Sequence, residues 1–364
     1  MTVQPMVFEE WPTADGSHIA VARLNMPKAL NSLSLEMIRL LTPQLKRWAE
    51  DSSICAVWLE AEGDKAFCAG GDIVALYRSM TEPRGAGAGA SEGATFFEEE
   101  YEMDYLIHTF PKPIVCWGHG IVMGGGMGIM AGASHRVVTE GSKLAMPESS
   151  IGLYPDVAAG WFLNRTPGRT GLFLGLTGAR MNGADALFVG LADRFIRHDL
   201  KAGVVEALKQ RNWQDQDSYA VVSSVLRQFE QQSADARPES PVRDHFDDIN
   251  RVTDADSLEE IVAQLNELSG GDGWLAKATK SLATASPTSL ALCWRHLKSV
   301  RHFSLKEVLD QELTISGNCL TKGEFAEGIR ALLIDKDQQP RWRYASLAEM
   351  DSAWIDDFFT RLQQ

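Results

Sequence analysis

The sequence predicts an α/β fold followed by a helical C-terminal section. Patterns typical of strands and of helices alternate along the first 198 residues, and strand patterns almost disappear after them. Such alternation is typical of a mainly parallel sheet with helices packed on it. We therefore expect an α/β core over residues 1–198, which carries the ligand site, and a helical section over residues 199–364 that packs on the core.

The core is expected to begin with two strands and a helix. Apolar and polar residues alternate over residues 6–24 around the turn at 14–16, which predicts two short strands. Ser34 then precedes a helical pattern that ends near Glu50. Further strands are predicted at residues 55–59 and 113–117, and further helices after Gly71 and over residues 96–109.

The helical section contains six apolar patterns with helical spacing. They cover residues 202–229, 258–268, 274–285, 288–300, 305–317 and 322–333. Within the core, residues 81–94, TEPRGAGAGASEGA, are small and flexible in composition. They predict a mobile loop rather than a linker between domains.

Composition narrows the class of protein. A chain of 364 residues with 45% hydrophobic and 23% charged residues is typical of a globular enzyme. No window approaches 18 consecutive apolar residues, so we predict no membrane span. The formal charge of −14 disfavours nucleic acid or an anionic membrane as the main partner. The acidic start MTVQPMVFEEWPTADG resembles neither a secretory signal nor a transit peptide, and we expect a cytoplasmic protein.

Several kinds of catalytic site are disfavoured by the motifs. The five cysteines form no C-x-x-C pair and no spacing typical of a metal site, which predicts reduced core thiols and no metal. A G-x-S-x-G elbow is missing, which disfavours a hydrolase with a serine nucleophile of that type.

The segment GHGIVMGGGMG at residues 118–128 is the most unusual stretch, with six glycines among eleven residues. Three explanations compete. The glycines could serve a tight turn and close packing of a helix. They could bind a dinucleotide phosphate, although the spacing is not G-x-G-x-x-G. They could also expose backbone N–H groups at a helix N-terminus toward a developing negative charge. The pair Gly70-Gly71 ahead of Asp72 favours the third explanation, because two such turns could each supply one N–H to a shared oxygen.

Three motifs carry a resemblance to a known family. They are AFCAGGDI at 66–73, GIVMGGGMG at 120–128 and LAMPESSIGLYPDVAAGWFL at 144–163. Together they resemble the enoyl-CoA hydratase/isomerase, or crotonase, superfamily, and within it most closely the 3-hydroxyisobutyryl-CoA hydrolases. The resemblance runs from about residue 6 to residue 343 and includes SPTSLALCWRHLK and EGIRALLIDKDQQPRW. It implies a crotonase-like spiral of ββα units, consistent with the units predicted above.

The resemblance also implies site residues. The backbone N–H groups of Gly71 and Gly125 would form an oxyanion hole for a thioester carbonyl, and Glu148 and Asp156 would be the catalytic acids. The positions that resemble the family's substrate and coenzyme A contacts are Lys28, Ala29, Leu30, Ala66, Phe67, Ala69, Gly71, Asp72, Ile73, Gly124, Gly125 and Gly128.

The carboxylates decide which reaction is expected. Gly128 stands where the hydratases carry their first glutamate, whereas Glu148 matches their second, and the Glu148 and Asp156 combination resembles the hydrolases. Glu148 could activate water or attack the thioester itself, and Asp156 could bind the substrate hydroxyl or share in proton transfer. Alternatively, each acid could cap a helix or pair with Arg165 or Arg169. His119, where the hydrolases often have asparagine, is expected to be a core residue or to support the site from behind, rather than to act as an acid or base.

The resulting prediction is a thioester hydrolase acting on 3-hydroxyisobutyryl-CoA from valine breakdown. It needs no cofactor, because coenzyme A is part of the substrate, and a homo-oligomer is possible. Two alternatives stay open: an enoyl-CoA isomerase or hydratase of the same superfamily, and a non-catalytic acyl-CoA binding protein.

Overall fold

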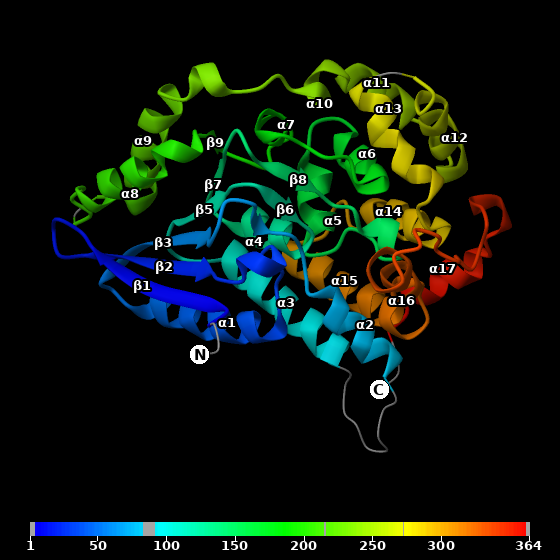
Figure 1. Cartoon of the computed structure of the whole chain (residues 1–364), viewed down its shortest axis with the longest axis horizontal. Coiled ribbons are helices and arrows are strands. Elements are labelled where there is room, and N and C mark those ends of the chain that lie inside the picture. Colours follow the sequence, from blue (N-terminus) through cyan, green and yellow to red (C-terminus); the bar gives the residue numbers. More distant parts are fainter. Residues whose placement is uncertain (1–3, 83–91, 215, 272, 362–364) are drawn as a thin grey trace. The chain divides into compact units, whose positions relative to one another are not determined.

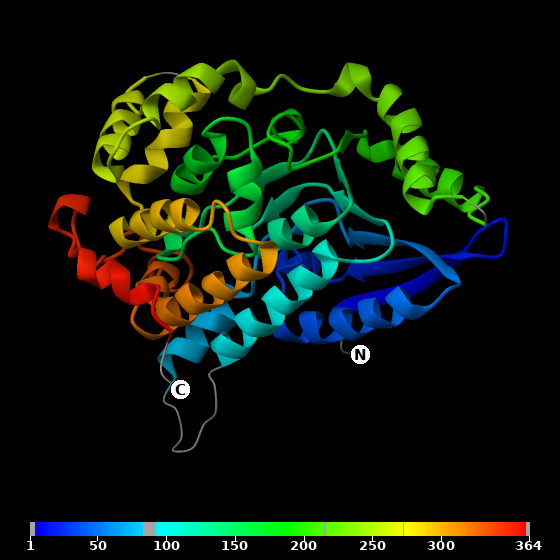
Figure 2. The same cartoon turned by 180° about the vertical axis from the view of Figure 1, so that it is seen from behind.

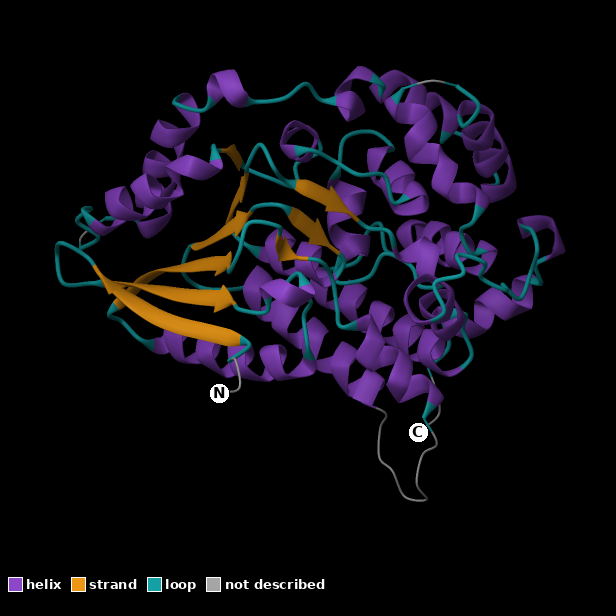
Figure 3. Cartoon of the chain, in the orientation of Figure 1, coloured by secondary structure: helices purple, strands orange, loops and turns teal. Residues whose placement is uncertain are grey.

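The computed structural model describes residues 4–82, 92–214, 216–271 and 273–361, and the strands of these residues form two sheets (Figures 1 and 3). The larger sheet has the order β1 (Met6–Pro12), β2 (His18–Leu24), β3 (Ile54–Ala61), β5 (Ile114–Gly118), β7 (His135–Val138) and β9 (Arg194–Phe195). The smaller sheet has the order β4 (Ala66–Cys68), β6 (Ile121–Met123) and β8 (Lys143–Ala145). Strands β1 and β2 are antiparallel, and the pairs from β2 to β9 in the larger sheet are parallel.

A repeated unit of two strands and a helix connects the sheets. In each of three successive strand pairs, the first strand (β3, β5 or β7) joins the larger sheet and the second (β4, β6 or β8) joins the smaller one. Helices α1 (Leu35–Glu50), α2 (Ile73–Thr81) and α4 (Gly125–Gly132) follow β2, β4 and β6. The predicted α/β fold with strand–strand–helix units is therefore confirmed.

The helical pattern after Ser34 is also confirmed in detail. Ser34 is extended, and its side chain accepts a hydrogen bond from the N–H of Met37, so it caps α1 as the sequence predicts. The ring of Trp48 in α1 contacts Phe8 of β1, whose paired residue on β2 is Ala22. Helix α1 therefore covers the sheet face to which Phe8 and Ala22 point.

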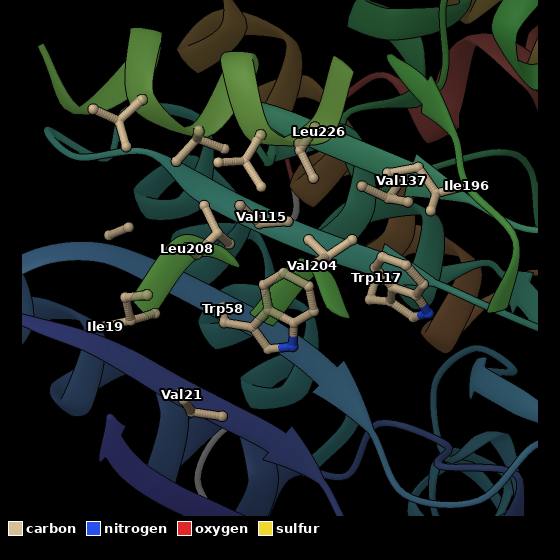
Figure 4. Close-up of a cluster of buried hydrophobic side chains, with 14 of the residues drawn as sticks. Ile19, Val21, Trp58, Val115, Trp117, Val137, Ile196, Val204, Leu208 and Leu226 are labelled. Carbon is tan, nitrogen blue, oxygen red and sulfur yellow. The ribbon is translucent and has the colours of Figure 1, made fainter. Parts of the chain in front are cut away.

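The opposite face of the larger sheet carries a cluster of buried hydrophobic side chains (Figure 4). Ile19 and Val21 of β2 point to this face, because side chains alternate along a strand. Trp58 and Trp117, from β3 and β5, stack with ring centroids 5.6 Å apart. Helices α8 (Lys201–Lys209) and α9 (Ser218–Gln231) complete the cluster with Val204, Leu208, Val221, Val222, Val225 and Leu226. The inner strands β2, β3 and β5 are buried on both faces and largely apolar, whereas the outer strand β1 is partly exposed.

By its internal contacts the chain divides into two units, each assembled from three segments. The first unit comprises Met1–Gly71, Glu102–Leu144 and Met181–Ser240, and the second comprises Asp72–Tyr101, Ala145–Arg180 and Pro241–Gln364. Residues 199–240, which the sequence analysis assigns to the helical section, belong to the first unit because α8 and α9 pack on its sheet. The division at residue 198 stays a prediction about domains.

The remaining helices are α3 (Glu92–His108), α5 (Ala159–Phe162), α6 (Thr170–Thr177), α7 (Gly183–Phe188), α10 (Pro241–Asp244), α11 (Phe246–Val252), α12 (Leu258–Leu268), α13 (Trp274–Thr279), α14 (Pro287–Ser299), α15 (Leu305–Thr321), α16 (Phe325–Ile329) and α17 (Ser352–Phe358). In the second unit, α17 contacts both α14 and α15, and these helices run from yellow-orange to red in Figure 2.

Three predicted helices differ from the structure. The pattern at 274–285 is an α-helix that ends at Thr279, followed by a 3₁₀ turn at Lys280–Ala283. The pattern at 202–229 is two helices, because α8 ends at Lys209 and the side chain of Asp217 caps the start of α9. The pattern at 322–333 is a short α-helix followed by a π turn at Arg330–Ile334. The predicted loop at 81–94 lies mostly outside the described residues, which resume at Glu92, the first residue of α3.

Two further expectations concern the described part of the chain. No helix within it is both long enough and apolar enough to cross a membrane. The five cysteines are not joined in disulfides within the described residues; four of them are buried and Cys55 is partly exposed.

Candidate active site

The glycine segment connects β6 to α4 through a turn that needs glycine twice. Gly124 has φ 50° and ψ −123°, a conformation that residues with a side chain rarely adopt. A Cβ at Gly126 would lie 2.4 Å from the carbonyl oxygen of Cys68, so only glycine lets α4 approach β4 this closely. Gly125 is the first residue of α4, and its N–H has no carbonyl one turn earlier to bind. The turn and the close packing thus leave the buried N–H of Gly125 without an acceptor within the helix, at the helix's positive end.

The second glycine turn follows β4. Gly70 has φ 108°, and its carbonyl accepts a hydrogen bond of 2.8 Å from the N–H of Leu33. Gly71 comes next and forms an isolated bridge with Leu33. A Cβ at Gly70 would lie 3.5 Å from the carbonyl oxygen of Met123, the last residue of β6.

The two turns lie at the same edge of the smaller sheet. Strands β4 and β6 are parallel neighbours, with Ala66 opposite Ile121 and Cys68 opposite Val122. Parallel neighbours end at the same edge of a sheet, so the turns that carry Gly71 and Gly125 are brought together there. This is the arrangement that a pair of N–H donors for one oxygen requires.

The segment predicted to contact coenzyme A is held against the same region by Asn31. Lys28 and Ala29 are exposed in a 3₁₀ turn, and Leu30 is partly buried. The Asn31 side chain is 1% exposed; it accepts a hydrogen bond from Met26 N–H at 2.8 Å and donates to the carbonyl of Ala66 at 2.9 Å.

A third bond from Asn31 reaches the carbonyl of Glu62 at 3.0 Å, and the N–H of Ala69 donates to the carbonyl of Leu30 at 3.1 Å. The predicted contacts at 28–30 and at 66–69 are therefore neighbours. Sequence reasoning missed Asn31, although an asparagine is the residue expected where a side chain must tolerate its φ of 54°.

We expect the Asn31→Gly variant to raise KM for acyl-CoA. Glycine keeps the backbone conformation, so the variant removes only the three side-chain hydrogen bonds, and the free energy of unfolding should fall by about 2 kcal/mol or more. Steady-state kinetics and urea unfolding measure both effects. A variant with wild-type KM would show that the segment at 28–30 does not contact the substrate.

Four other predicted contacts have structural roles in the described residues. Phe67 is fully buried, and its N–H donates to the carbonyl of His119. Asp72 caps α2, because its side chain accepts a hydrogen bond of 3.1 Å from Ala75 N–H, and Ile73 is the first residue of that helix. Gly128 is buried within α4.

The two acids lie in the second unit. Glu148 is the first residue of a 3₁₀ turn, Glu148–Ile151, and is 5% exposed. Asp156 is 4% exposed and accepts a hydrogen bond of 2.6 Å from the Tyr101 hydroxyl. Within the described ranges, Oε2 of Glu148 has no hydrogen-bond partner.

Burial and mutual repulsion control the protonation of this pair. Burial, with the negative charge of Asp156 beside it, raises the pKa of Glu148 well above its usual value. Burial also raises the pKa of Asp156 to about 7, against the opposing effect of the bond from Tyr101. The structure therefore brings the two predicted acids close enough to raise the pKa of Glu148 by mutual repulsion, and the pKa of about 7 lets Asp156 exchange a proton near neutral pH.

The structure contradicts the alternative roles for Asp156. Helix α5 begins at Ala159, and no side chain caps it, so Asp156 is not a helix cap. Arg165 lies over the ring of Trp161, 3.1 Å from its centroid, and Arg169 pairs with Asp254.

His119 is a core residue, as predicted. Its side chain is 2% exposed, and its Nε2 lies 2.7 Å from the carbonyl oxygen of Gly63. Burial lowers the pKa of His119, which keeps the ring neutral.

Helix α14, from the motif SPTSLALCWRHLK, packs on the turn that carries Glu148. The N–H of Ser286 donates to the carbonyl of Ser149 at 3.0 Å. Burial, and then the nearby charge of Glu148, raises the pKa of the Cys293 thiol. Sequence reasoning recognised the motif but did not place it beside Glu148.

A metal site is not seen in the part of the chain that the structure describes. It contains no group of three or more His, Cys, Asp or Glu side chains able to hold an ion.

Known proteins resemble this chain along most of its length. The family model described as enoyl-CoA hydratase/isomerase matches residues 19–359. A protein of Danio rerio named mitochondrial 3-hydroxyisobutyryl-CoA hydrolase is 41% identical over 347 residues, which cover 94% of this chain and 87% of that protein. The protein of the same name from Homo sapiens is 38% identical over 343 residues, 94% of this chain and 86% of that protein.

Solved structures share the fold over nearly the whole chain. An enoyl-CoA hydratase from Rhodobacter sphaeroides is 33% identical with a TM-score of 0.82, covering 99% of this chain and 98% of that one. A carnitinyl-CoA dehydratase from Mycobacterium thermoresistibile is 33% identical with a TM-score of 0.85, covering 99% of this chain and 97% of that one.

The relatives contradict the predicted cytoplasmic location, because their names place those proteins in mitochondria. The prediction was wrong because it relied only on the composition of residues 1–16. The evidence from the fold and from the two acids did not enter it.

The family match spans most of the sequence, and the relatives exceed 37% identity over 94% of it. This family match agrees with the strand–strand–helix units and with the two glycine turns at one edge of the smaller sheet. The chain belongs to the enoyl-CoA hydratase/isomerase family.

Proposed function

We propose that this protein hydrolyses the thioester of 3-hydroxyisobutyryl-CoA to 3-hydroxyisobutyrate and coenzyme A. The observation that carries the proposal is the buried pair of Glu148 and Asp156, together with a helix α4 whose sequence, GGMGIMAG, contains no carboxylate. Curated relatives across 94% of the chain bear the name of this hydrolase. We further propose that the reaction serves the breakdown of valine.

The backbone N–H groups of Gly71 and Gly125 would bind the thioester carbonyl oxygen. Negative charge develops on that oxygen when the carbonyl carbon is attacked, and N–H donors at a helix N-terminus stabilise it. The position of the two glycine turns at one edge of the smaller sheet supports this assignment. Coenzyme A enters as part of the substrate, and the reaction needs no other cofactor.

Glu148 would supply the base or the nucleophile. As a base, it removes a proton from water while the water oxygen attacks the carbonyl carbon, and the C–S bond then breaks to release the thiol. As a nucleophile, it forms a mixed anhydride and releases the thiol first, and water then cleaves the anhydride. In either route Asp156, with a pKa of about 7, would bind the substrate hydroxyl or transfer the proton that the thiolate needs.

A second candidate function is the hydration or isomerisation of an enoyl-CoA. The two solved structures above support it, because they are titled enoyl-CoA hydratase and carnitinyl-CoA dehydratase. Hydratases that this chain resembles use two acids for hydration. One of these acids lies on the glycine-rich helix, where this chain has Gly128. Glu148 alone could still move a proton next to a thioester, so isomerisation is the stronger form of this candidate.

Thiol release tests the choice between these functions. Purified protein is mixed with (S)-3-hydroxyisobutyryl-CoA and a thiol-reactive dye, with crotonyl-CoA and a 3-enoyl-CoA followed by absorbance in parallel. We expect rapid thiol release from the hydroxyacyl substrate and no change in enoyl absorbance. A change in enoyl absorbance without thiol release would favour the second candidate. Binding of the substrate without any reaction would indicate a non-catalytic acyl-CoA binding protein.

A further inference from the structure

We propose that Glu312 is a positioning residue: its carboxylate holds the strained turn after Asp156 and thereby sets the position of the Asp156 carboxyl group. The inference rests on the proposed function only in calling Asp156 catalytic. Glu312 lies on α15, more than 150 positions further along the chain, and its side chain is 0% exposed.

Both oxygens of the Glu312 carboxylate bind the backbone of this turn. Oε2 accepts a hydrogen bond of 2.7 Å from the N–H of Ala158, and Oε1 accepts one of 3.0 Å from the N–H of Gly160. Oε1 also lies 3.0 Å from Nε2 of His296, which must donate because a carboxylate only accepts. A buried carboxylate that binds two N–H groups fixes a backbone more firmly than neutral acceptors would.

The backbone that Glu312 holds would not keep this shape by itself. Val157 has φ 53° and Ala158 has φ 70°, in the left-handed region that residues with a side chain rarely adopt. For the β-branched Val157 the conformation is especially unfavourable, and such strain persists only where surrounding contacts compensate it. The N–H groups bound by Glu312 belong to the strained residue Ala158 and to Gly160, two residues later.

Gly160 lets the turn approach the partners of Glu312. A Cβ at this position would lie 2.4 Å from Nε2 of His296 and 3.0 Å from Cγ1 of Val308. The absence of a side chain at Gly160 is therefore what allows the N–H, the carboxylate and the imidazole to meet.

A second connection runs from α15 to Asp156 through hydroxyl groups. Ser316, one helical turn after Glu312, lies 2.7 Å from the Tyr101 hydroxyl and 3.1 Å from the Tyr154 hydroxyl. Tyr101 donates to Asp156, and Tyr154 donates to the backbone carbonyl of Glu312 at 2.9 Å. One face of α15 thus holds Asp156 from both sides, through its hydroxyl donor and through its backbone.

Glu312 also influences the protonation of Asp156. The titratable groups that face Asp156 are Glu148, Tyr101, Tyr154, Cys319 and Glu312 itself. After burial, the negative charge of Glu312 is the main effect that raises the pKa of Asp156. Removing this charge should therefore lower the pKa of Asp156. Removing a buried carboxylate that has only a structural role in another part of the chain should leave that pKa unchanged.

The Glu312→Gln variant tests the proposal. Glutamine keeps the volume but has one acceptor oxygen, so one backbone N–H faces an NH₂ group. We expect kcat for thiol release to fall by about 100-fold with little change in KM, because a displacement of about 1 Å in a catalytic group has that effect. In the same variant, ¹³C NMR of labelled aspartate, assigned with the Asp156→Asn variant, should show Asp156 titrating at lower pH than in the wild type.

Asp185→Asn is the matched control. Asp185 is 1% exposed and likewise accepts a backbone hydrogen bond, from Asn182 N–H, but lies in the other unit of the chain. It should lower stability and leave kcat and the Asp156 titration unchanged. Glu312→Asp keeps the charge and both oxygens on a shorter side chain, so it should reduce kcat without lowering the pKa of Asp156, and it tests the proposal if Glu312→Gln does not fold.

Wild-type kcat in either Glu312 variant would overturn the proposal, and so would an Asp156 titration that Glu312→Gln leaves unchanged. The titration needs no substrate. It therefore tests Glu312 even if the wild type releases no thiol, in which case the proposed function fails separately.

Discussion

The Glu148→Gln variant is expected to lose at least about 10³-fold in kcat for thiol release, because it removes the base or nucleophile while it conserves side-chain volume. The affinity for acyl-CoA should change little, because glutamine has nearly the same volume as the glutamate it replaces. Stopped-flow thiol release and binding of a non-hydrolysable thioether analogue measure the two quantities.

The same variant has a predicted effect on stability. The pKa of Glu148 is ordinary in the unfolded chain and raised in the folded protein. Between these values the folded protein binds more protons, so the wild-type free energy of unfolding falls as pH rises through that interval. Glutamine does not titrate, so the variant should be at least as stable as the wild type at pH 7. The difference should disappear at about pH 4, near the pKa of an exposed glutamate.

Glu60→Gln is the control for both effects. Glu60 is 4% exposed, but contacts with Lys201, Trp58 and Arg23 outweigh its burial and lower its pKa. Its replacement should reduce stability at pH 7 and leave kcat near the wild-type value. If Glu148→Gln retains full activity, or loses no more than Glu60→Gln, Glu148 is not the catalytic group.

Replacing Gly125 by proline should reduce kcat by about 10²- to 10³-fold, which is the loss of one oxyanion donor, about 2.7–4 kcal/mol. Proline deletes the N–H and leaves the rest of the turn in place. Gly125 is the first residue of α4, a position where proline fits a helix. The folded structure should therefore survive, which circular dichroism and a thermal melt can verify.

Gly125→Ala separates the donor from the side chain, because alanine keeps the N–H. We expect it to retain much more activity than Gly125→Pro. Equal losses in the two variants would mean that Gly125 matters because it has no side chain or because of its backbone conformation. The proposed oxyanion hole would then be rejected.

The parts of the site that depend on local backbone could be predicted from the sequence. The glycine turns follow strands and open helices, and the strand pattern around them is strong enough to locate the turns. Ser34 and the ends of α12 were likewise predictable, since capping and apolar spacing act over a few residues. Glu148 and Asp156 came from the motif they share with the family.

The supporting residues depend on contacts that join distant parts of the chain. The bond from Glu312 to Ala158 spans 154 positions, and the one from Ser316 to Tyr101 spans 215, so no local pattern contains them. One signal was available: Glu312 and Ser316 share the buried stripe of α15 with Val308, Ile315 and Cys319, and a carboxylate at such a position needs a buried partner. The break between α8 and α9 was missed although Asp217 is a residue type typical of a helix N-cap, and its side chain does cap α9.

The position of oxygen from water in the product tests the central claim most directly. The enzyme is incubated with 3-hydroxyisobutyryl-CoA in H₂¹⁸O, and the acid and remaining thioester are analysed by mass spectrometry over many turnovers. Hydrolysis predicts one ¹⁸O in the carboxylate of the free acid and none in the hydroxyl group at C3. Label at the C3 hydroxyl of the intact thioester, without free acid, would mean that the enzyme removes and adds water at the carbon chain, and it would contradict the assignment as a thioester hydrolase.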